Sequence, residues 1–163
     1  MSEKAQLRKL EDDLNVSGTG AILMGLWSII RVIMQVYVEL KKKMDTELAA
    51  NETFEKTLVV ILVMLLLGVL CAAVMMIHLY IGLNAIRAAK GMKYKKGYFA
   101  ATIIFGLLTV SSLDMYLEEF RKIEDIDTTI ASMLVDLTTI YIFAVIIIST
   151  VKLRKLREKE IQE

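Results

Sequence analysis

The sequence has no proline, one cysteine and one histidine, and these scarcities exclude several kinds of site. Cys71 cannot form a disulfide within the chain, so cysteine use says nothing about a redox compartment. Cys71 and His78 fall short of the three or four ligands that zinc normally takes, so we expect no metal and no cofactor. The HExxH, GxSxG, P-loop and CxxC motifs are absent from the sequence, so we expect no catalytic residues and no enzyme activity.

Charged residues make up 24% of the chain and sum to a net charge of +1, which gives no reason to expect a nucleic-acid partner. They crowd between long apolar runs. Hydrophobic residues reach 56%, above the about 45–50% of globular proteins. The mean hydropathy is +0.55. This segregation predicts an all-α, polytopic integral membrane protein whose first partner is the lipid bilayer.

Residues 57–86 form the longest apolar run, with no charge and only His78 and Asn84 as strongly polar side chains. A bilayer core needs about 20 apolar helical residues. A helix that is apolar on all sides would need a much larger protein to bury it in water. We therefore predict a membrane span here. The full set of predicted spans is 20–38, 57–86, 97–113 and 128–151, in one compact domain of four transmembrane helices over residues 1–163.

Residues 1–17 are polar and do not fit a cleavable signal, so we expect the mature protein to keep them. Leu7, Leu10 and Leu14 are spaced to share one face of a helix that lies along the lipid headgroups. A solvated polar tail is the alternative. The sequence Ser-Gly-Thr-Gly at 17–20 is expected to break any helix before the first span.

Lysine and arginine in short loops predict the orientation. Residues 87–96 have five basic and no acidic residues, and the tail 152–163 is basic and expected to be helical and solvated. Both are expected in the cytoplasm, and four crossings then place both termini there. Loops 39–56 and 114–127 face outside, although Lys41–Lys43 are discordant. We expect a multi-pass protein of the plasma membrane. Because residues 39–56 lack proline and glycine, the helices beside them should project beyond the bilayer.

Residues 20–28 (GAILMGLWS) are similar to residues 101–109 (ATIIFGLLT), in two spans that run in the same direction. A duplicated helical hairpin would explain the likeness, as parallel repeats about an axis along the membrane normal. The second and fourth spans show no comparable match, which weakens this interpretation.

Arg31 and Asp136 are ionisable residues inside predicted spans, where insertion costs about 2.5–3.5 kcal/mol, so each is expected to face a partner or a water-filled space. Counted from the span ends at about 1.5 Å per residue, both lie about 10–12 Å below the outer boundary. Opposite charges at matching depth predict an ion pair between the first and last spans. The pair either fixes which helices pack together or belongs to a gate or binding site, and the structural interpretation is favoured.

Other polar residues extend this pair along each helix. Facing one another, the two stripes would form a hydrogen-bonded seam or a narrow polar cavity that opens outward. Acidic residues of the outer loops would attract a cation to such a cavity. Charge that serves only solubility is the simpler explanation. The stripes are Ser28, Arg31 and Gln35 on the first span, and Ser132, Asp136 and Thr139 on the fourth.

His78 is expected to be a packing residue with a partner rather than a ligand or proton relay, and Asn84 is expected near the inner interface. Small residues spaced four apart permit close helix contact in lipid. Such spacing favours a tight bundle and is compatible with a homo-oligomer. The pairs are Ala21/Gly25, Gly68/Ala72 and Thr102/Gly106.

Two classes of function follow from these observations. The first is a non-enzymatic membrane module that acts through helix packing and protein partners, with a homo-oligomer as one form. The second is a small channel or transporter whose polar seam at Arg31, Gln35 and Asp136 handles an ion or small solute. Because four short helices enclose little space, transport would require several copies of the chain.

Overall fold

The computed structural model describes residues 3–47, 54–114, 116 and 126–160, with side chains over 3–38, 58, 60–114, 116 and 129–159. These residues form helices and turns without any strand, and the predicted all-α class is confirmed. The helices are α1 (Glu3–Glu47), α2 (Phe54–Ala89), α3 (Gly97–Ser111) and α5 (Ile126–Glu160).

Three of these helices, α1, α2 and α5, are long and apolar enough to cross a membrane. With 45 residues at about 1.5 Å each, α1 extends about 68 Å, more than twice the about 30 Å of a bilayer core. Both α1 and α2 continue past the predicted spans into residues 39–56, because α1 ends at Glu47 and α2 begins at Phe54; their projection beyond the bilayer stays a prediction. With 15 residues, α3 is about 22 Å long and shorter than the predicted span 97–113. The chain is a multi-pass membrane protein with three full-length helices and a shorter apolar fourth.

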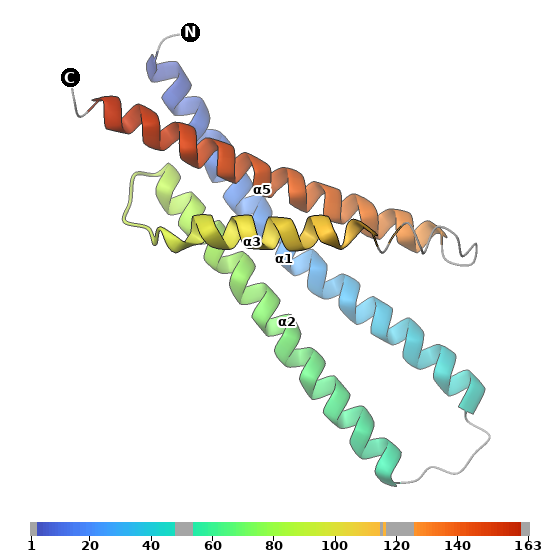
Figure 1. The fold of residues 1–163 in the computed structure, drawn as a ribbon. Helices are drawn as coiled ribbons and strands as arrows, with labels where there is room; N and C mark the ends of the chain where they lie inside the picture. The colour runs from blue at the N-terminus through green and yellow to red at the C-terminus, as the bar shows by residue number, and fades with distance from the viewer. Residues whose placement is uncertain (1–2, 48–53, 115, 117–125, 161–163) are drawn as a thin grey trace.

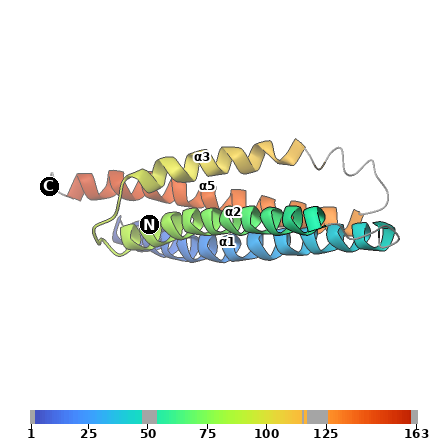
Figure 2. The same cartoon turned by 90° about the horizontal axis from the view of Figure 1, so that it is seen from below.

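The helices form two antiparallel hairpins that cross as two layers (Figures 1 and 2). In one layer α1 packs along α2, and in the other α3 packs along α5, while α1 also contacts α5 across the layers. Both termini and the α2–α3 connection lie at the same end of the molecule (Figure 1), as an even number of crossings requires. We call this the basic end, defined by the start of α1, residues 87–96 and the last turns of α5. Its cytoplasmic location stays a prediction.

Two glycines bring α1 and α2 into close contact near the basic end. A Cβ built on Gly18 would lie 2.9 Å from the carbonyl oxygen of Gly82, and one built on Gly82 would lie still closer to that of Gly18. The prediction that residues 17–20 break the helix is wrong, because α1 runs through them without interruption. Close packing in lipid favours glycine at such a contact. This packing outweighs the low helix propensity of glycine, which is about 1 kcal/mol per residue less favourable than that of alanine.

The N-terminal segment belongs to α1 and packs against protein. Leu14 is fully buried, and Leu7 and Leu10 pack partly buried against the same core. The predicted leucine face is confirmed, but it covers protein rather than lipid headgroups, and the alternative of a solvated tail is wrong. The physical reason is the length of α5, which continues to Glu160 and places Leu153 in that core. The C-terminal tail is helical as predicted, with one face buried.

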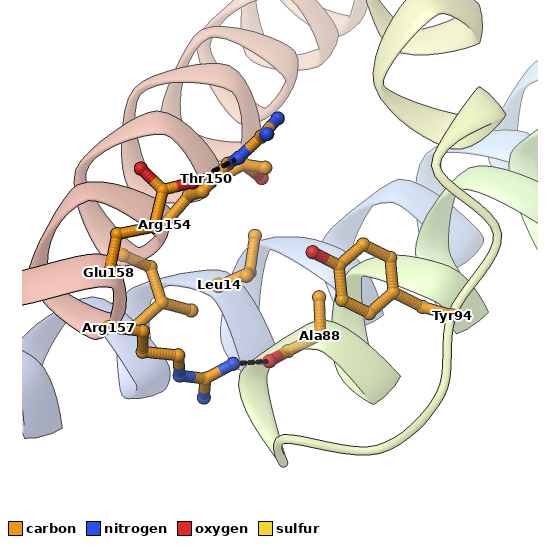
Figure 3. A pocket seen from close by; sticks show the side chains of 8 residues that line it. Leu14, Ala88, Tyr94, Thr150, Arg154, Arg157 and Glu158 are labelled. Atoms are coloured by element: carbon orange, nitrogen blue, oxygen red, sulfur yellow. Dashed lines mark hydrogen bonds and ion pairs between the residues drawn. The ribbon is translucent and has the colours of Figure 1, made fainter. Parts of the chain in front are cut away.

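A charged contact at the basic end joins three helices and was not predicted; Figure 3 shows the part of it between Arg157 and Ala88. Arg157 on α5 donates to Glu11 Oε1 on α1 at 2.9 Å. It also donates to the carbonyl oxygens of Ala88 at 3.0 Å and Ala89 at 3.3 Å, in the last turn of α2. Carbonyl groups at a helix C-terminus carry partial negative charge, so a guanidinium is favoured there. Arg157 therefore ties α5 to both α1 and α2.

The buried core lies toward the basic end, where its largest fully buried side chains include Tyr98, Phe143 and Ile146. The Tyr98 hydroxyl and that of Thr150 are 2.8 Å apart, which links α3 to α5. In contrast, the described apolar side chains of α2 between 58 and 70 are almost all exposed. In a bilayer, this surface contacts lipid or other helices.

The likeness of residues 20–28 to residues 101–109 stays a prediction. Gly25 lies against His78 of α2, and Gly106 lies against Phe143 of α5, so each glycine faces the next long helix of its own hairpin. The two helices differ greatly in length, however, because α1 has 45 residues and α3 has 15.

Candidate functional site

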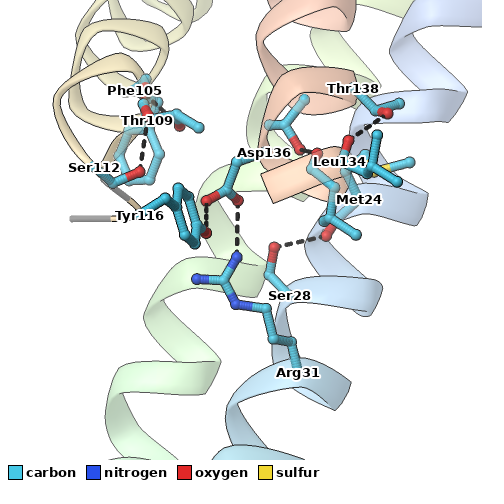
Figure 4. Close-up of polar contacts among 12 residues, drawn as sticks. Met24, Ser28, Arg31, Phe105, Thr109, Ser112, Tyr116, Leu134, Asp136 and Thr138 are labelled. Atoms are coloured by element: carbon cyan, nitrogen blue, oxygen red, sulfur yellow. Dashed lines mark hydrogen bonds and ion pairs between the residues drawn. The ribbon is translucent and has the colours of Figure 1, made fainter. Parts of the chain in front are cut away.

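An ion pair joins α1 to α5 in the apolar part of the molecule (Figure 4). Arg31 Nη1 donates to Asp136 Oδ1 at 2.9 Å, which confirms the contact predicted from charge and depth. The Asp136 side chain is 13% exposed and the Arg31 side chain 28%, so the pair is largely removed from solvent. Arg31 lies in the second half of α1 and Asp136 in the first half of α5, so the ion pair is away from the basic end.

Tyr116 completes this cluster and was not predicted. Its hydroxyl donates to Asp136 Oδ2, so both carboxylate oxygens have a partner in the same chain (Figure 4). The phenol is the donor in this bond, because a carboxylate without a proton can only accept. Tyr116 was missed because the predicted cluster contained only polar residues inside the spans. Tyr116 lies beyond the end of α3, in a stretch predicted to be an outer loop. The one feature of the sequence that could have indicated its role is that this aromatic residue stands among acidic residues.

The predicted polar seam around the ion pair is not formed by the described side chains. The Ser28 hydroxyl donates to the carbonyl oxygen of Met24 at 2.8 Å, and the Thr139 hydroxyl donates to a carbonyl one turn back at 2.9 Å. Such bonds use the hydroxyl proton within its own helix. Gln35 is exposed and Ser132 half-buried, and within the described residues neither bonds to the facing helix. The structure brings together Arg31 and Asp136 but not the stripes beside them.

His78 is buried between aromatic rings of the second hairpin. Its Nδ1 lies 2.9 Å from the carbonyl oxygen of Val74, one turn back on α2. The ring centroid lies 6.1 Å from that of Phe105 and 5.8 Å from that of Phe143. This geometry favours the packing interpretation. In the part of the chain that the structure describes, no three His, Cys, Asp or Glu side chains lie close enough together to hold a metal ion.

Asn84, which was predicted to lie near the inner interface, bonds across the α2–α3 connection. Its amide nitrogen donates to the Tyr80 carbonyl oxygen at 2.7 Å, and its Oδ1 accepts from the Lys95 backbone N–H at 2.9 Å. The helix α2 ends at Ala89, and Gly91 follows with φ of +67°. The backbone amides of Gly91 and Met92 bond back to the last turn of α2 in a Schellman motif. Asn84 therefore has a structural partner across the turn.

The acidic residues at which a cation was predicted lie almost entirely outside the described side chains. Asp114 is the described member of the second acidic loop, and it is exposed. Lys41–Lys43, the discordant basic residues, also lie outside the described side chains.

Chemically, the cluster provides a fixed pair of charges in which both oxygens of the carboxylate are engaged. A guanidinium cannot release its proton at physiological pH, and both oxygens of Asp136 accept hydrogen bonds from Arg31 and Tyr116. No protein-family model, curated protein or solved structure matches the chain. What can be inferred about function therefore depends on these residues and their geometry.

Proposed function

We propose that this chain is a non-enzymatic module of the plasma membrane that acts by packing its helices against other membrane helices, including those of a second copy. The observation that supports this function is the engagement of Asp136 by Arg31 and Tyr116 within one chain. A carboxylate that binds a passing cation needs an oxygen that the protein does not already engage. The hydroxyls of Ser28 and Thr139 beside the pair are bonded to their own helices instead.

The ion pair serves structure in this proposal. In lipid, helix association has no hydrophobic driving force, so packing and polar contacts decide which helices are neighbours. The charges of Arg31 and Asp136 make α1 and α5 neighbours, and Tyr116 adds the segment beyond α3. Replacing such a pair by apolar residues is often tolerated, whereas leaving one charge alone is costly.

The outer part of α2 offers a surface for a second copy. Leu62, Leu66 and Val69 lie on one face at helical spacing and are 69%, 70% and 68% exposed. No described part of the chain covers these side chains, so another helix can pack against them in lipid.

The mass of the protein in lipid, together with an ion-flux assay, tests the proposal. We expect the purified chain in lipid nanodiscs or liposomes to be oligomeric and to pass K⁺ and H⁺ no faster than empty liposomes, while an added ionophore restores flux. Leu66→Trp should reduce the oligomer. Leu107→Trp, which alters a 65% exposed leucine on α3, is the matched control and should not.

Two results would contradict the proposal. A monomer in lipid would remove the role assigned to α2. Flux above that of empty liposomes, lost when Arg31 and Asp136 are both replaced by leucine, would favour the channel or transporter instead.

A further inference from the structure

A pocket of about 160 Å³ opens at the basic end between α5, the start of α1 and the end of α2 (Figure 3). Its floor is apolar and consists of Leu14, Ala88 and Leu153, which are 0%, 2% and 3% exposed. A cavity needs about 10–15 Å³ of such space to hold one water molecule. The pocket therefore has room for a group of several heavy atoms.

The rim of the pocket is polar and contains groups with spare hydrogen-bonding capacity. The Tyr94 hydroxyl points toward the pocket (Figure 3) and has no hydrogen-bond partner among the described residues. Arg154 bonds to Glu158 at 2.9 Å, in a pair whose side chains are 66% and 60% exposed. Such an exposed pair is weak, so most donors of Arg154 are available. Arg157 adds a second guanidinium to the lining.

The pocket lies where the apolar part of the chain gives way to its basic part. Thr150, which lines it, is next to the end of the predicted span 128–151, and the basic tail begins at Lys152. On α2 the apolar run ends at Ile86, and residues 87–96 add five positive charges and no negative one. On the predicted orientation, this is the level of the cytoplasmic headgroups. The cytoplasmic leaflet holds the anionic lipids, and basic pockets between transmembrane helices bind their headgroups.

From this geometry we infer that the pocket binds an anionic phospholipid of the cytoplasmic leaflet. The phosphate accepts hydrogen bonds from Arg154 and Tyr94, and the glycerol backbone covers the apolar floor. A guanidinium matches phosphate geometry because its planar fork donates two parallel bonds. The phosphate thereby replaces Glu158 as the main partner of Arg154.

The position of Arg154 separates this site from the general positive charge of the basic end. Lys155, the next residue, is also exposed, but it points about 100° away around α5 and does not line the pocket. A diffuse attraction between lysines and anionic lipid would depend on both residues equally. A built pocket depends on Arg154.

Lipid titration of the full chain in detergent, read by native mass spectrometry, tests the inference. Phosphatidylglycerol and phosphatidylcholine with the same acyl chains are the probes. We expect phosphatidylglycerol to bind about tenfold more tightly, because the choline cation of phosphatidylcholine offsets the charge of its phosphate and is repelled by the guanidinium groups. R154Q should lose about tenfold in phosphatidylglycerol affinity. K155Q, the matched control, should change it less than about twofold, and E158Q should raise it because Arg154 is then unpaired.

Three results would overturn the inference: equal binding of the two lipids, equal losses in R154Q and K155Q, or glycerol 3-phosphate binding as tightly as phosphatidylglycerol. The last would identify a small soluble anion rather than a lipid as the ligand. Circular dichroism and unfolding in sodium dodecyl sulfate check that R154Q is folded. If it is not, Tyr94→Phe removes one hydroxyl from the rim and should weaken phosphatidylglycerol binding several-fold, and unchanged affinity would overturn the inference.

Discussion

Removing Asp136 alone should destabilise the protein more than removing Asp136 and Arg31 together. Asp136→Leu leaves a guanidinium that cannot lose its proton in apolar surroundings, and breaking a buried pair in this way costs about 3–5 kcal/mol. The Arg31 side chain is 28% exposed and long, so part of it can extend away from the apolar surroundings. We therefore expect a cost at the lower end, about 3 kcal/mol.

Arg31→Leu should cost less, about 1–2 kcal/mol, because Asp136 keeps the hydrogen bond from Tyr116 and a carboxylate can take up a proton. In the double variant no charge is left, although the Tyr116 hydroxyl loses its acceptor, and we expect a cost of about 1–2 kcal/mol. The two substitutions are then coupled by about 3 kcal/mol.

Reversible unfolding in mixed micelles of rising dodecyl sulfate content measures these free energies. The fluorescence of Trp27, the single tryptophan, reports from α1 one turn before Arg31. Gln35→Leu is the matched control, because Gln35 lies one turn further along α1 and is exposed. Its coupling to Asp136→Leu should be close to zero. If the double variant instead loses the sum of the two single losses, the ion pair does not hold α1 to α5.

Further predictions concern the contacts that hold α1, α2 and α5 at the basic end. Gly82→Ala should cost about 1–3 kcal/mol because its Cβ would meet the α1 backbone, whereas Gly68→Ala on the same helix should be neutral or stabilise by up to about 1 kcal/mol, both read by dodecyl sulfate unfolding. Arg157→Gln should cost about 1–2 kcal/mol through lost contacts with Glu11 and the α2 C-terminus, and an unchanged unfolding midpoint would contradict this. Asn84→Ala should accelerate hydrogen exchange of the backbone amides in the α2–α3 connection, and exchange at the wild-type rate would show that its side chain does not fix the turn.

The helices and the ion pair could be predicted because lipid imposes simple requirements. Long apolar runs such as 57–86 must be helical there, since every backbone group needs a partner within the segment. Arg31 and Asp136 stood out because charges are rare and costly in such runs. Their matching depth then followed from counting residues, which needs no tertiary information.

The remaining contacts could not be predicted because they depend on how segments far apart in the sequence approach one another. Glycine both weakens a helix and lets two helices touch. The sequence of residues 17–20 is therefore equally consistent with a helix break and with a close helix contact. The presence of Gly82 opposite Gly18 decides between them. Tyr116 and Arg157 likewise have ordinary surroundings in the sequence, and only the paths of α3 and α5 bring them to their partners.

The two partly buried ion pairs of α1 both reach α5, and together they specify how these helices pair. Glu11 and Arg31 are 20 residues apart on α1, and their partners Arg157 and Asp136 are 21 residues apart on α5, which is about 30 Å on either helix. A shift of one turn, about 5.4 Å, would separate both pairs at once. Reversing the direction of α5 would bring acid to acid and base to base. On both helices an acid precedes a base, and this order of charges fits an antiparallel pair in one register. In lipid, where the hydrophobic effect does not drive helix association, such charge contacts select which helices pack together.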